Sequence, residues 1–148
     1  MESSYKKLAI AIAINTVIMF FLTYVNIIRL NTFHFNLNRV YMALIMAAPM
    51  VIVMLLVMRS MFKNPRMNAM LLAGAAAATI LIFILIRTQT PVGDQQFLNS
   101  MIPHHSSAIL MCEQSAITDP EILELCDQII QSQEEEIAQM ESILQRYR

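Results

Sequence analysis

Three long apolar runs occupy the first 87 residues of this 148-residue chain. They extend from Leu8 to about Ile28, from about Val40 to Met61 and from about Met67 to Ile86. A helix rises about 1.5 Å per residue, so each run is long enough to cross a hydrocarbon core of roughly 30 Å. Of all residues, 57% are hydrophobic and only 14% are charged. This composition predicts a membrane protein with three spans.

A cleaved signal peptide is the alternative interpretation of the first run. The apolar region of a signal peptide would be about half as long and would end at a small-residue cleavage site. The segment that follows, Arg29-Leu-Asn-Thr-Phe-His34, offers no such site. We therefore expect the first run to be a membrane span.

Charge divides the chain into two unlike parts. Residues 1–87 carry eight Lys or Arg against Glu2, whereas residues 88–148 carry two Arg against ten acids. The Lys and Arg near the span ends are Lys6, Lys7, Arg59, Lys63 and Arg66 on one side, and Arg29, Arg39 and Arg87 on the other. The positive-inside rule predicts a cytoplasmic N-terminus and an extracytoplasmic C-terminal part, in an inner or plasma membrane. Residues 88–148 are acidic and contain no Lys, which argues against nucleic acid as a partner, because binding requires positive charge to neutralise phosphates.

The second and third spans each carry a row of similar residues four apart. The small residues of the third span are Ala69, Ala73 and Ala77, together with Gly74 and Ala78. Small residues let helix backbones approach closely, and we expect packing inside the three-helix bundle, with a dimer contact as the alternative. The methionines of the second span are Met42, Met46, Met50, Met54 and Met58. Such a row can fill gaps between helices, which we favour, or pass Cu(I) along the span.

Residues 88–148 are predicted to form two helices that fold back on each other. Asp94 is placed to cap a helix from Gln95 to about Ile117. Pro103 lies inside this helix and is expected to kink it or to force a restart after Ser100. Because proline has no N–H, it leaves the carbonyl of Asn99 without its helical donor, one turn before two histidines.

The second of these helices begins with clear start signals. Asp119 is the predicted N-cap, Pro120 takes the first helical position, and the helix runs to about Tyr147. With a short turn between two antiparallel helices, residues whose numbers sum to about 238 lie at the same level. Cys112 then faces Cys126, and His105 faces Gln133.

Soft metal ligands cluster on the first helix of this hairpin. The segment from Met101 to Cys112 holds two of the three histidines, two methionines and one of the two cysteines. Adjacent histidines point about 100° apart on a helix, so we expect one ligand and one residue facing a second shell or a partner. Imidazole and thioether together suit Cu(I) or Ag(I), whereas Mg²⁺ and Ca²⁺ require oxygen ligands. Core packing by these histidines and methionines is the alternative.

The two cysteines allow three interpretations. Outside the cytoplasm, Cys112 and Cys126 can form a disulfide that closes a loop of about 15 residues and contributes about 3 kcal/mol in the entropy model. Alternatively, both remain reduced and bind metal, or both remain reduced and only pack.

The C-terminal motif resembles the family called domain of unknown function 305. The pattern is Asp94-x-x-Phe97-x-x-x-Met101-Ile-Pro-His104-His105-x-x-Ala108-Ile-x-Met111, followed by Ile129-x-x-x-Gln133-x-x-Glu136-Ile137-x-x-Met140. The resemblance implies a ferritin-like helical bundle and an extracytoplasmic copper-binding protein. It also implies that the metal-handling positions are Met101, His104, His105, Met111 and Met140.

Two helices alone cannot bury a closed core, so we expect a homodimer that completes a four-helix bundle. Its interface would bury Leu125, Ile129, Ile137 and Met140. The predicted organisation is an all-α chain with a three-span domain at 1–87 and an extracytoplasmic metal-binding hairpin at 88–148.

The favoured function is Cu(I) or Ag(I) sequestration, tolerance or delivery by a protein anchored in the lipid bilayer. A copper-transporter-like membrane oligomer and a structural oligomerisation module without metal are the competing hypotheses. Catalysis is not expected, because Ser106 and Ser107 beside the histidines have no orienting acid at a useful spacing.

Overall fold

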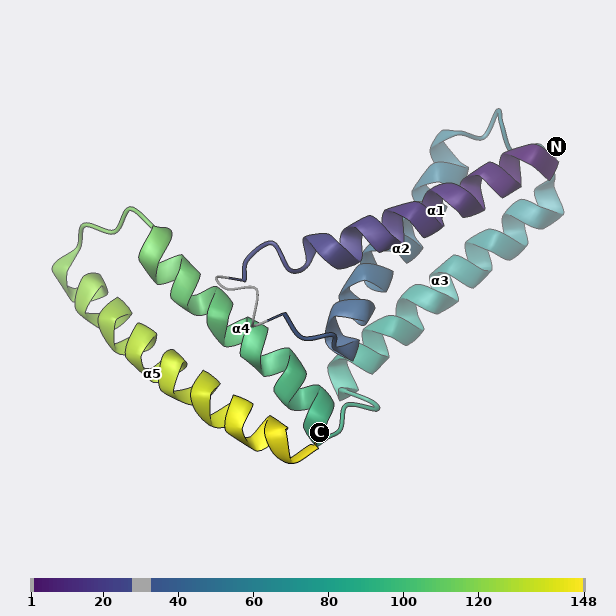
Figure 1. Ribbon diagram of the computed structural model, residues 1–148. Helices are drawn as coiled ribbons and strands as arrows, with labels where there is room; N and C mark the ends of the chain where they lie inside the picture. Colours follow the sequence, from purple (N-terminus) through teal and green to yellow (C-terminus); the bar gives the residue numbers. More distant parts are fainter. Residues whose placement is uncertain (1, 28–32, 148) are drawn as a thin grey trace. The chain divides into compact units, whose positions relative to one another are not determined.

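The computed structural model describes residues 2–27 and 33–147. Within these residues the secondary structure is helical, without a strand, which confirms the predicted all-α class (Figure 1). The helices are α1 (Glu2–Leu22), α2 (Leu37–Val57), α3 (Pro65–Thr88), α4 (Asp94–Gln114) and α5 (Pro120–Leu144), followed by the short 3-10 helix η2 (Gln145–Tyr147).

The chain divides into two compact units. Unit 1 consists of Met1–Thr23 and Asn38–Pro91, and unit 2 consists of Tyr24–Leu37 and Val92–Arg148. Unit 2 thus includes described residues of the loop between α1 and α2, where Asn36 donates to the carbonyl of Asn99 on α4.

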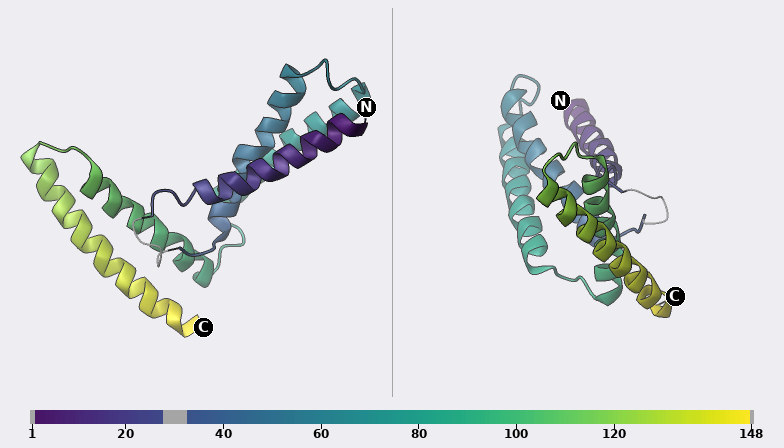
Figure 2. Two further views of the ribbon diagram at one scale, coloured as in Figure 1. Left: turned by 45° about the horizontal axis from the view of Figure 1, so that its top comes forward. Right: turned by 90° about the vertical axis from the view of Figure 1, so that its left-hand side faces the viewer.

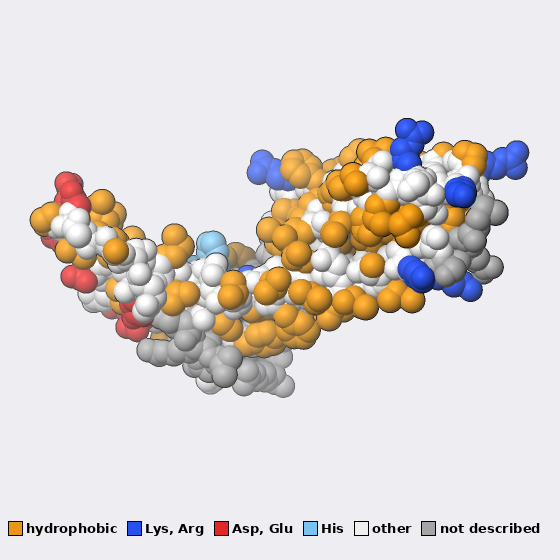
Figure 3. Space-filling model, turned by 90° about the horizontal axis from the view of Figure 1, so that it is seen from above, with side chains coloured by type: hydrophobic (Ala, Val, Ile, Leu, Met, Phe, Trp, Pro, Cys, Tyr) orange, Lys and Arg blue, Asp and Glu red, His pale blue; other side chains and the backbone are white. Residues whose placement is uncertain are grey.

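Unit 1 contains three helices that are long and apolar enough to cross a membrane: Ser4–Leu22, Leu37–Val57 and Pro65–Thr88. Hydrophobic side chains cover much of its visible face (Figure 3). The first helix ends at Leu22, earlier than the predicted end near Ile28, and turns follow at residues 23–26. Ile28 itself and Arg29 lie outside the described residues.

A small cluster joins the three helices of unit 1 at the end where the chain begins. Leu8, Leu55 and Phe62 form its buried core. At the same end, the hydroxyl of Tyr5 donates to Asn68 Oδ1 at 2.8 Å. Asn64 caps α3 by accepting from the backbone N–H of residue 67 at 3.1 Å. These local contacts fix the tight turn that precedes α3.

The two rows of similar residues lie only partly inside unit 1. In α3 the only buried residue is Ala75, whereas Ala69, Ala73, Gly74 and Ala77 are exposed. Ala78, the last member of the row, is half-buried, so most but not all of the small-residue row lies outside the packing of the three-helix unit. The methionine row of α2 winds around its helix: Met42, Met46 and Met50 are exposed, whereas Met54 and Met58 pack against the core cluster.

In unit 2, α4 and α5 lie side by side and run in opposite directions (Figures 1 and 2). Leu98 and Ile102, near the start of α4, pack against Leu144 at the end of α5. Cys112, near the end of α4, is bonded to Cys126, near the start of α5. The two helices therefore contact each other along most of their length.

The starts of both helices follow local rules, with one difference from expectation. Gly93 is the N-cap of α4, so Asp94 is its first residue and not its cap. The carboxylate of Asp94 instead accepts from the hydroxyl of Tyr147 at 3.3 Å. For α5, Asp119 is the N-cap as predicted: its carboxylate accepts from the N–H groups of Glu121 at 2.9 Å and Ile122 at 3.2 Å.

Replacing Asp119 by Ala is expected to destabilise α5. The substitution removes the only side-chain acceptor at its N-terminus among the described contacts, and losing such a cap costs about 1 kcal/mol. Thermal unfolding of the chain in detergent, followed by circular dichroism, measures the loss. Asp127→Ala is the matched control, because Asp127 is an exposed acid inside the same helix. Equal destabilisation by both substitutions would contradict the capping role.

Candidate metal-binding site

The two adjacent histidines of α4 face different surroundings. His105 is buried, with 8% of its surface exposed, whereas His104 is exposed. Their ring centroids are 6.3 Å apart and the ring planes are inclined by 66°. This is the divergence that adjacent positions on a helix predict, so the two imidazoles do not point to the same place.

His105 lies at the contact between α4 and α5, next to an acid of α5. Its Nδ1 is 3.1 Å from Glu136 Oε2, although the alignment of the two groups is not that of a hydrogen bond. The other oxygen of Glu136 accepts from the hydroxyl of Ser132 at 3.2 Å, which holds the carboxylate in place. Because the Glu136 carboxylate lies beside Nδ1, Nε2 is the ring nitrogen that a metal ion would bind.

The sequence placed His105 opposite Gln133, one turn away from Glu136. The physical reason for the difference is that each Cα–Cβ bond on a helix tilts toward the N-terminus of its own helix. On α4 this tilt points away from the connecting turn, and on α5 it points toward the turn. A side chain of α4 therefore meets a residue further along α5 than the level of its Cα suggests.

Burial lowers the pKa of the His105 imidazole below its ordinary value. The largest cause is the loss of solvent around the charged form; the nearby carboxylate of Glu136 raises the pKa in opposition, and His104 lowers it. The neutral form, which is the form that binds metals, is therefore favoured.

The three candidate methionines occupy different environments. Met101 is half-buried on α4, and Met140 is half-buried on α5, where it packs against the cluster of Leu98, Ile102 and Leu144. Met111 is 66% exposed and lies on the surface of the unit. The structure places the next residue, Cys112, at the contact with α5, as the sequence predicted. Met111 is thus not brought to the contact between the helices.

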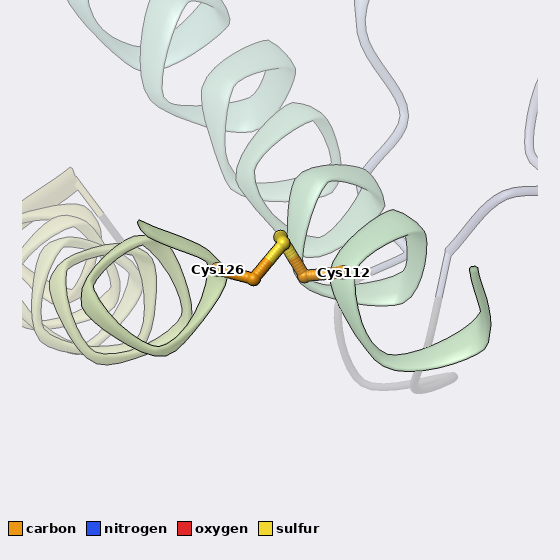
Figure 4. Close-up of a disulfide and its surroundings, with 2 residues drawn as sticks. All are labelled: Cys112 and Cys126. Carbon is orange, nitrogen blue, oxygen red and sulfur yellow. A yellow bond between two sulfur atoms is a disulfide. The ribbon is translucent and has the colours of Figure 1, made fainter. Parts of the chain in front are cut away.

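The two cysteines form a disulfide between α4 and α5 (Figure 4). Their Cα atoms are 5.4 Å apart and their sequence separation is 14 residues. This is the first of the three interpretations that the sequence allowed. In this oxidised form neither sulfur is a thiolate, so Cys112 and Cys126 do not add thiolate ligands to the site.

Among the described residues, no three side chains of His, Cys, Asp or Glu gather closely enough to hold a metal ion. A metal site on α4 and α5 would therefore depend on thioether sulfur beside imidazole. The soft donors of the two helices are the buried His105 and the half-buried Met101 and Met140, with His104 exposed. Met101 precedes His105 by one turn of α4, and Met140 packs at the contact between the helices. Soft donors of this kind suit Cu(I) and not the hard cations.

Two residues near the histidines were not among the predicted site residues. Glu136 is one, although its place in the Gln133-x-x-Glu136 pattern and the acid-rich face of α5 could have indicated it. Asn36 is the other: it is fully buried and donates to the carbonyl of Asn99 at 3.1 Å. The sequence signal for it was indirect: Pro103 leaves the carbonyl of Asn99 without its helical donor, so another group has to donate there.

These features define a buried histidine and a carboxylate between two disulfide-linked helices, in a chain that also has three apolar helices. Residues 56–144 match the family described as Domain of unknown function (DUF305). This match covers more than half of the chain, and the chain belongs to that family. The matched region includes α3 as well as α4 and α5, so it extends further toward the N-terminus than the motif between Asp94 and Met140.

A viral relative is also similar to this chain. Uncharacterized protein L153 of Acanthamoeba polyphaga mimivirus is 39% identical over 113 residues, which is 74% of this chain and 71% of the relative. No solved structure matches the chain.

Replacing Glu136 by Gln is expected to lower the pKa of His105 further, because the carboxylate is the influence that raises it. NMR titration of the histidine ring protons in the metal-free chain measures this pKa. The control is Glu135→Gln, since Glu135 bonds to Gln131 on the same helix and not to His105. An unchanged or higher pKa in Glu136→Gln would contradict the assignment.

The same pKa shift makes stability depend on pH. The folded chain holds the His105 proton more weakly than the unfolded chain, so the unfolded chain binds more protons. The contribution of His105 is therefore complete above its ordinary pKa of 6.5 and is lost as the pH falls through the lowered value. Chemical unfolding of the metal-free chain at a series of pH values, compared with His105→Ala, isolates this contribution. A difference between the two chains that does not vary with pH would contradict it.

The disulfide is expected to stabilise unit 2. Replacing both Cys112 and Cys126 by Ser removes the covalent link between two positions separated by 14 residues. In the entropy model, closing a loop of this size raises the free energy of unfolding by about 3 kcal/mol. Thiol labelling of the native, unreduced chain should find neither sulfur reactive. Substantial labelling, or unfolding of the double variant at the same denaturant concentration as the parent, would contradict the prediction.

Proposed function

We propose that this chain is a membrane-anchored metal-binding protein that holds Cu(I) or Ag(I) for sequestration, tolerance or delivery. The observation that carries the proposal is the placement of His105. It is buried between α4 and α5 with Nδ1 3.1 Å from Glu136 Oε2. The carboxylate places a negative charge beside one ring nitrogen and leaves the other nitrogen for a metal ion, and metal-ligating histidines commonly have a carboxylate on this side of the ring.

The available donors favour a soft monovalent ion. The proposed imidazole ligand is His105, and the proposed thioether ligands are Met101 and Met140. His104 would either face a partner or act as a further ligand of the ion. When bound, the ion supplies no catalytic step in this proposal: the protein binds and releases it. Membership of the family adds support, because the resemblance that the motif carries implies copper binding by methionine and histidine.

We propose that α1, α2 and α3 anchor the protein in an inner or plasma membrane, with the N-terminus in the cytoplasm. The distribution of Lys and Arg supports this orientation. It would place α4 and α5 outside the cytoplasm as a hairpin. The Cys112–Cys126 disulfide is consistent with that location, since disulfides persist in oxidising compartments.

We further propose that two copies join to complete a ferritin-like four-helix bundle. Large apolar side chains remain exposed on α5, among them Leu123 at 46% and Leu125 at 53%. Ile137 and Met140, which the sequence assigned to the dimer interface, already pack against α4. The dimer contact would therefore centre on Leu125 and Ile129, and the exposed small residues of α3 would assist it inside the membrane.

A transporter-like oligomer is the second candidate. It is favoured by the exposed methionines Met42, Met46 and Met50 of α2. Methionines on the outside of a single chain cannot line a path through that chain, so this function would require α2 helices from several copies around a central axis. Uptake of Cu(I) by sealed vesicles containing the protein separates this candidate from binding alone. A structural module without metal is separated from both by the absence of Cu(I) binding.

The central experiment is a Cu(I) titration of the full chain in detergent against a competing chelator, with a reductant that leaves the disulfide intact. We expect tight binding in the parent and at least about a tenfold loss of affinity in the His104→Ala, His105→Ala double variant, because each lost ligand bond contributes more than about 1.4 kcal/mol. Met101→Leu tests the thioether ligand, and Met70→Leu is its control, since Met70 is 71% exposed on α3. A parent that binds no Cu(I), or a double variant that binds as tightly as the parent, would overturn the proposal.

A further inference from the structure

Pro103 creates a defect in α4 that the helix cannot repair by itself. In a helix each N–H normally donates to the carbonyl four residues earlier, but proline has no N–H. The carbonyl of Asn99 therefore lacks its helical donor. Nevertheless, α4 continues without a break from Asp94 to Gln114, and the predicted restart after Ser100 does not occur.

The missing donor comes from the loop between α1 and α2. Asn36 Nδ2 donates to the carbonyl of Asn99 at 3.1 Å, across 63 positions of sequence. The side chain of Asn36 is fully buried, with 0% of its surface exposed. A buried carbonyl without a partner is costly, so this contact replaces the bond that Pro103 removes.

The loop is organised to aim Asn36 at this carbonyl. The same amide group donates to the carbonyl of His34 at 2.9 Å, which also accepts from the hydroxyl of Tyr24 at 2.8 Å. The ring of Tyr24 packs against that of Phe33, with centroids 4.3 Å apart. Several contacts within the loop thus fix the direction of one amide group.

A second bond joins the loop to α4 one turn earlier. The N–H of Leu37 donates to Gln96 Oε1 at 3.0 Å. Gln96 and Asn99 are three positions apart and so lie on the same side of α4. Pro103 and Ser106 continue this side and are buried, Ser106 completely. The opposing side of the helix carries His105 and Cys112 to α5, so α4 is held between α5 and the loop.

We infer that Asn36 is a positioning residue for the histidine turn of α4, and that the described loop residues, 24–27 and 33–37, are an integral part of the unit that holds the proposed metal site. The Asn99 carbonyl is one turn before His104 and His105, so its anchoring sets where that turn lies relative to Glu136 on α5. The effect of Asn36 on metal binding rests on the proposed Cu(I) site, whereas its effect on the position of the histidine turn does not.

The position of Asn36 in the sequence makes the pair of helices α4 and α5 depend on the segment between α1 and α2. The loop continues directly into α1 at one end and α2 at the other. It also lies outside residues 56–144, the region that matches the family. The helix pair of this protein therefore depends on a segment that the family motif does not contain, and a fragment that begins after α3 would lose the donor to Asn99.

A double-mutant cycle between Asn36 and Pro103 tests the inference in the metal-free full chain in detergent. Asn36→Leu removes the donor, whereas Pro103→Ala restores a backbone N–H and with it the helical bond to Asn99. We expect Asn36→Leu to speed amide exchange at residues 100–106 by about tenfold or more, the effect of leaving a buried carbonyl unpaired. In the Pro103→Ala background the same substitution should have a much smaller effect.

The control is Asn26→Leu, because Asn26 is an exposed asparagine of the same loop. It should leave exchange in α4 unchanged. If Asn36→Leu does not fold, Asn36→Ala takes its place in the cycle. Equal effects of the Asn36 substitution in both backgrounds would show that Asn36 acts only by general packing, and would overturn the inference.

The functional arm uses Cu(I) affinity and the NMR signals of the His105 ring. Asn36→Leu should weaken affinity and shift the ring signals, and Pro103→Ala should restore both, which a merely structural role would not predict. Unchanged Cu(I) affinity in Asn36→Leu, together with faster exchange, would overturn the positioning role. If the parent binds no Cu(I), the proposed function fails, while the exchange cycle and the ring signals still decide the inference about Asn36.

Discussion

The contact between α4 and α5 is the interaction on which the rest of unit 2 depends. The cluster of Leu98, Ile102 and Leu144 fixes one part of this contact, and the Cys112–Cys126 disulfide fixes another. His105 lies between these two anchors along α4. Burying an imidazole is costly, and the Glu136 carboxylate of the facing helix places a negative charge 3.1 Å from its Nδ1, without the alignment of a hydrogen bond. The polar pair is thus held at a defined place by apolar packing on one side and a covalent bond on the other.

Features that depend on neighbours in sequence could be predicted from the sequence. The apolar runs predict three long helices, and Asp119 followed by Pro120 predicts the start of α5, because capping is decided within one turn of chain. The divergence of His104 and His105 follows from helix geometry alone. The sequence could also reduce the cysteines to three alternatives, but it could not choose among them, since that choice depends on the distance between two helices and on the redox state of the compartment.

Features that depend on distant contacts could not be predicted. The end of α1 at Leu22 is an example: the apolar run continues past it, but Tyr24 turns away to hold the carbonyl of His34. The pairing of His105 with Glu136 instead of Gln133 depends on the opposite tilts of side chains on antiparallel helices. Asn36 is the clearest case, because its bond to Asn99 spans 63 positions and no local pattern marks it.

The charge near His105 bears on which ion the proposed site could hold. Imidazole and thioether ligands are neutral, so an ion bound by them keeps its full charge in a partly buried place, which is costly for a divalent ion without further anionic ligands. No group of three His, Cys, Asp or Glu exists among the described residues to supply them. A single carboxylate, Glu136, lies 3.1 Å from the His105 ring. One negative charge balances one positive charge, so the carboxylate beside the imidazole is consistent with the monovalent soft ion that we propose.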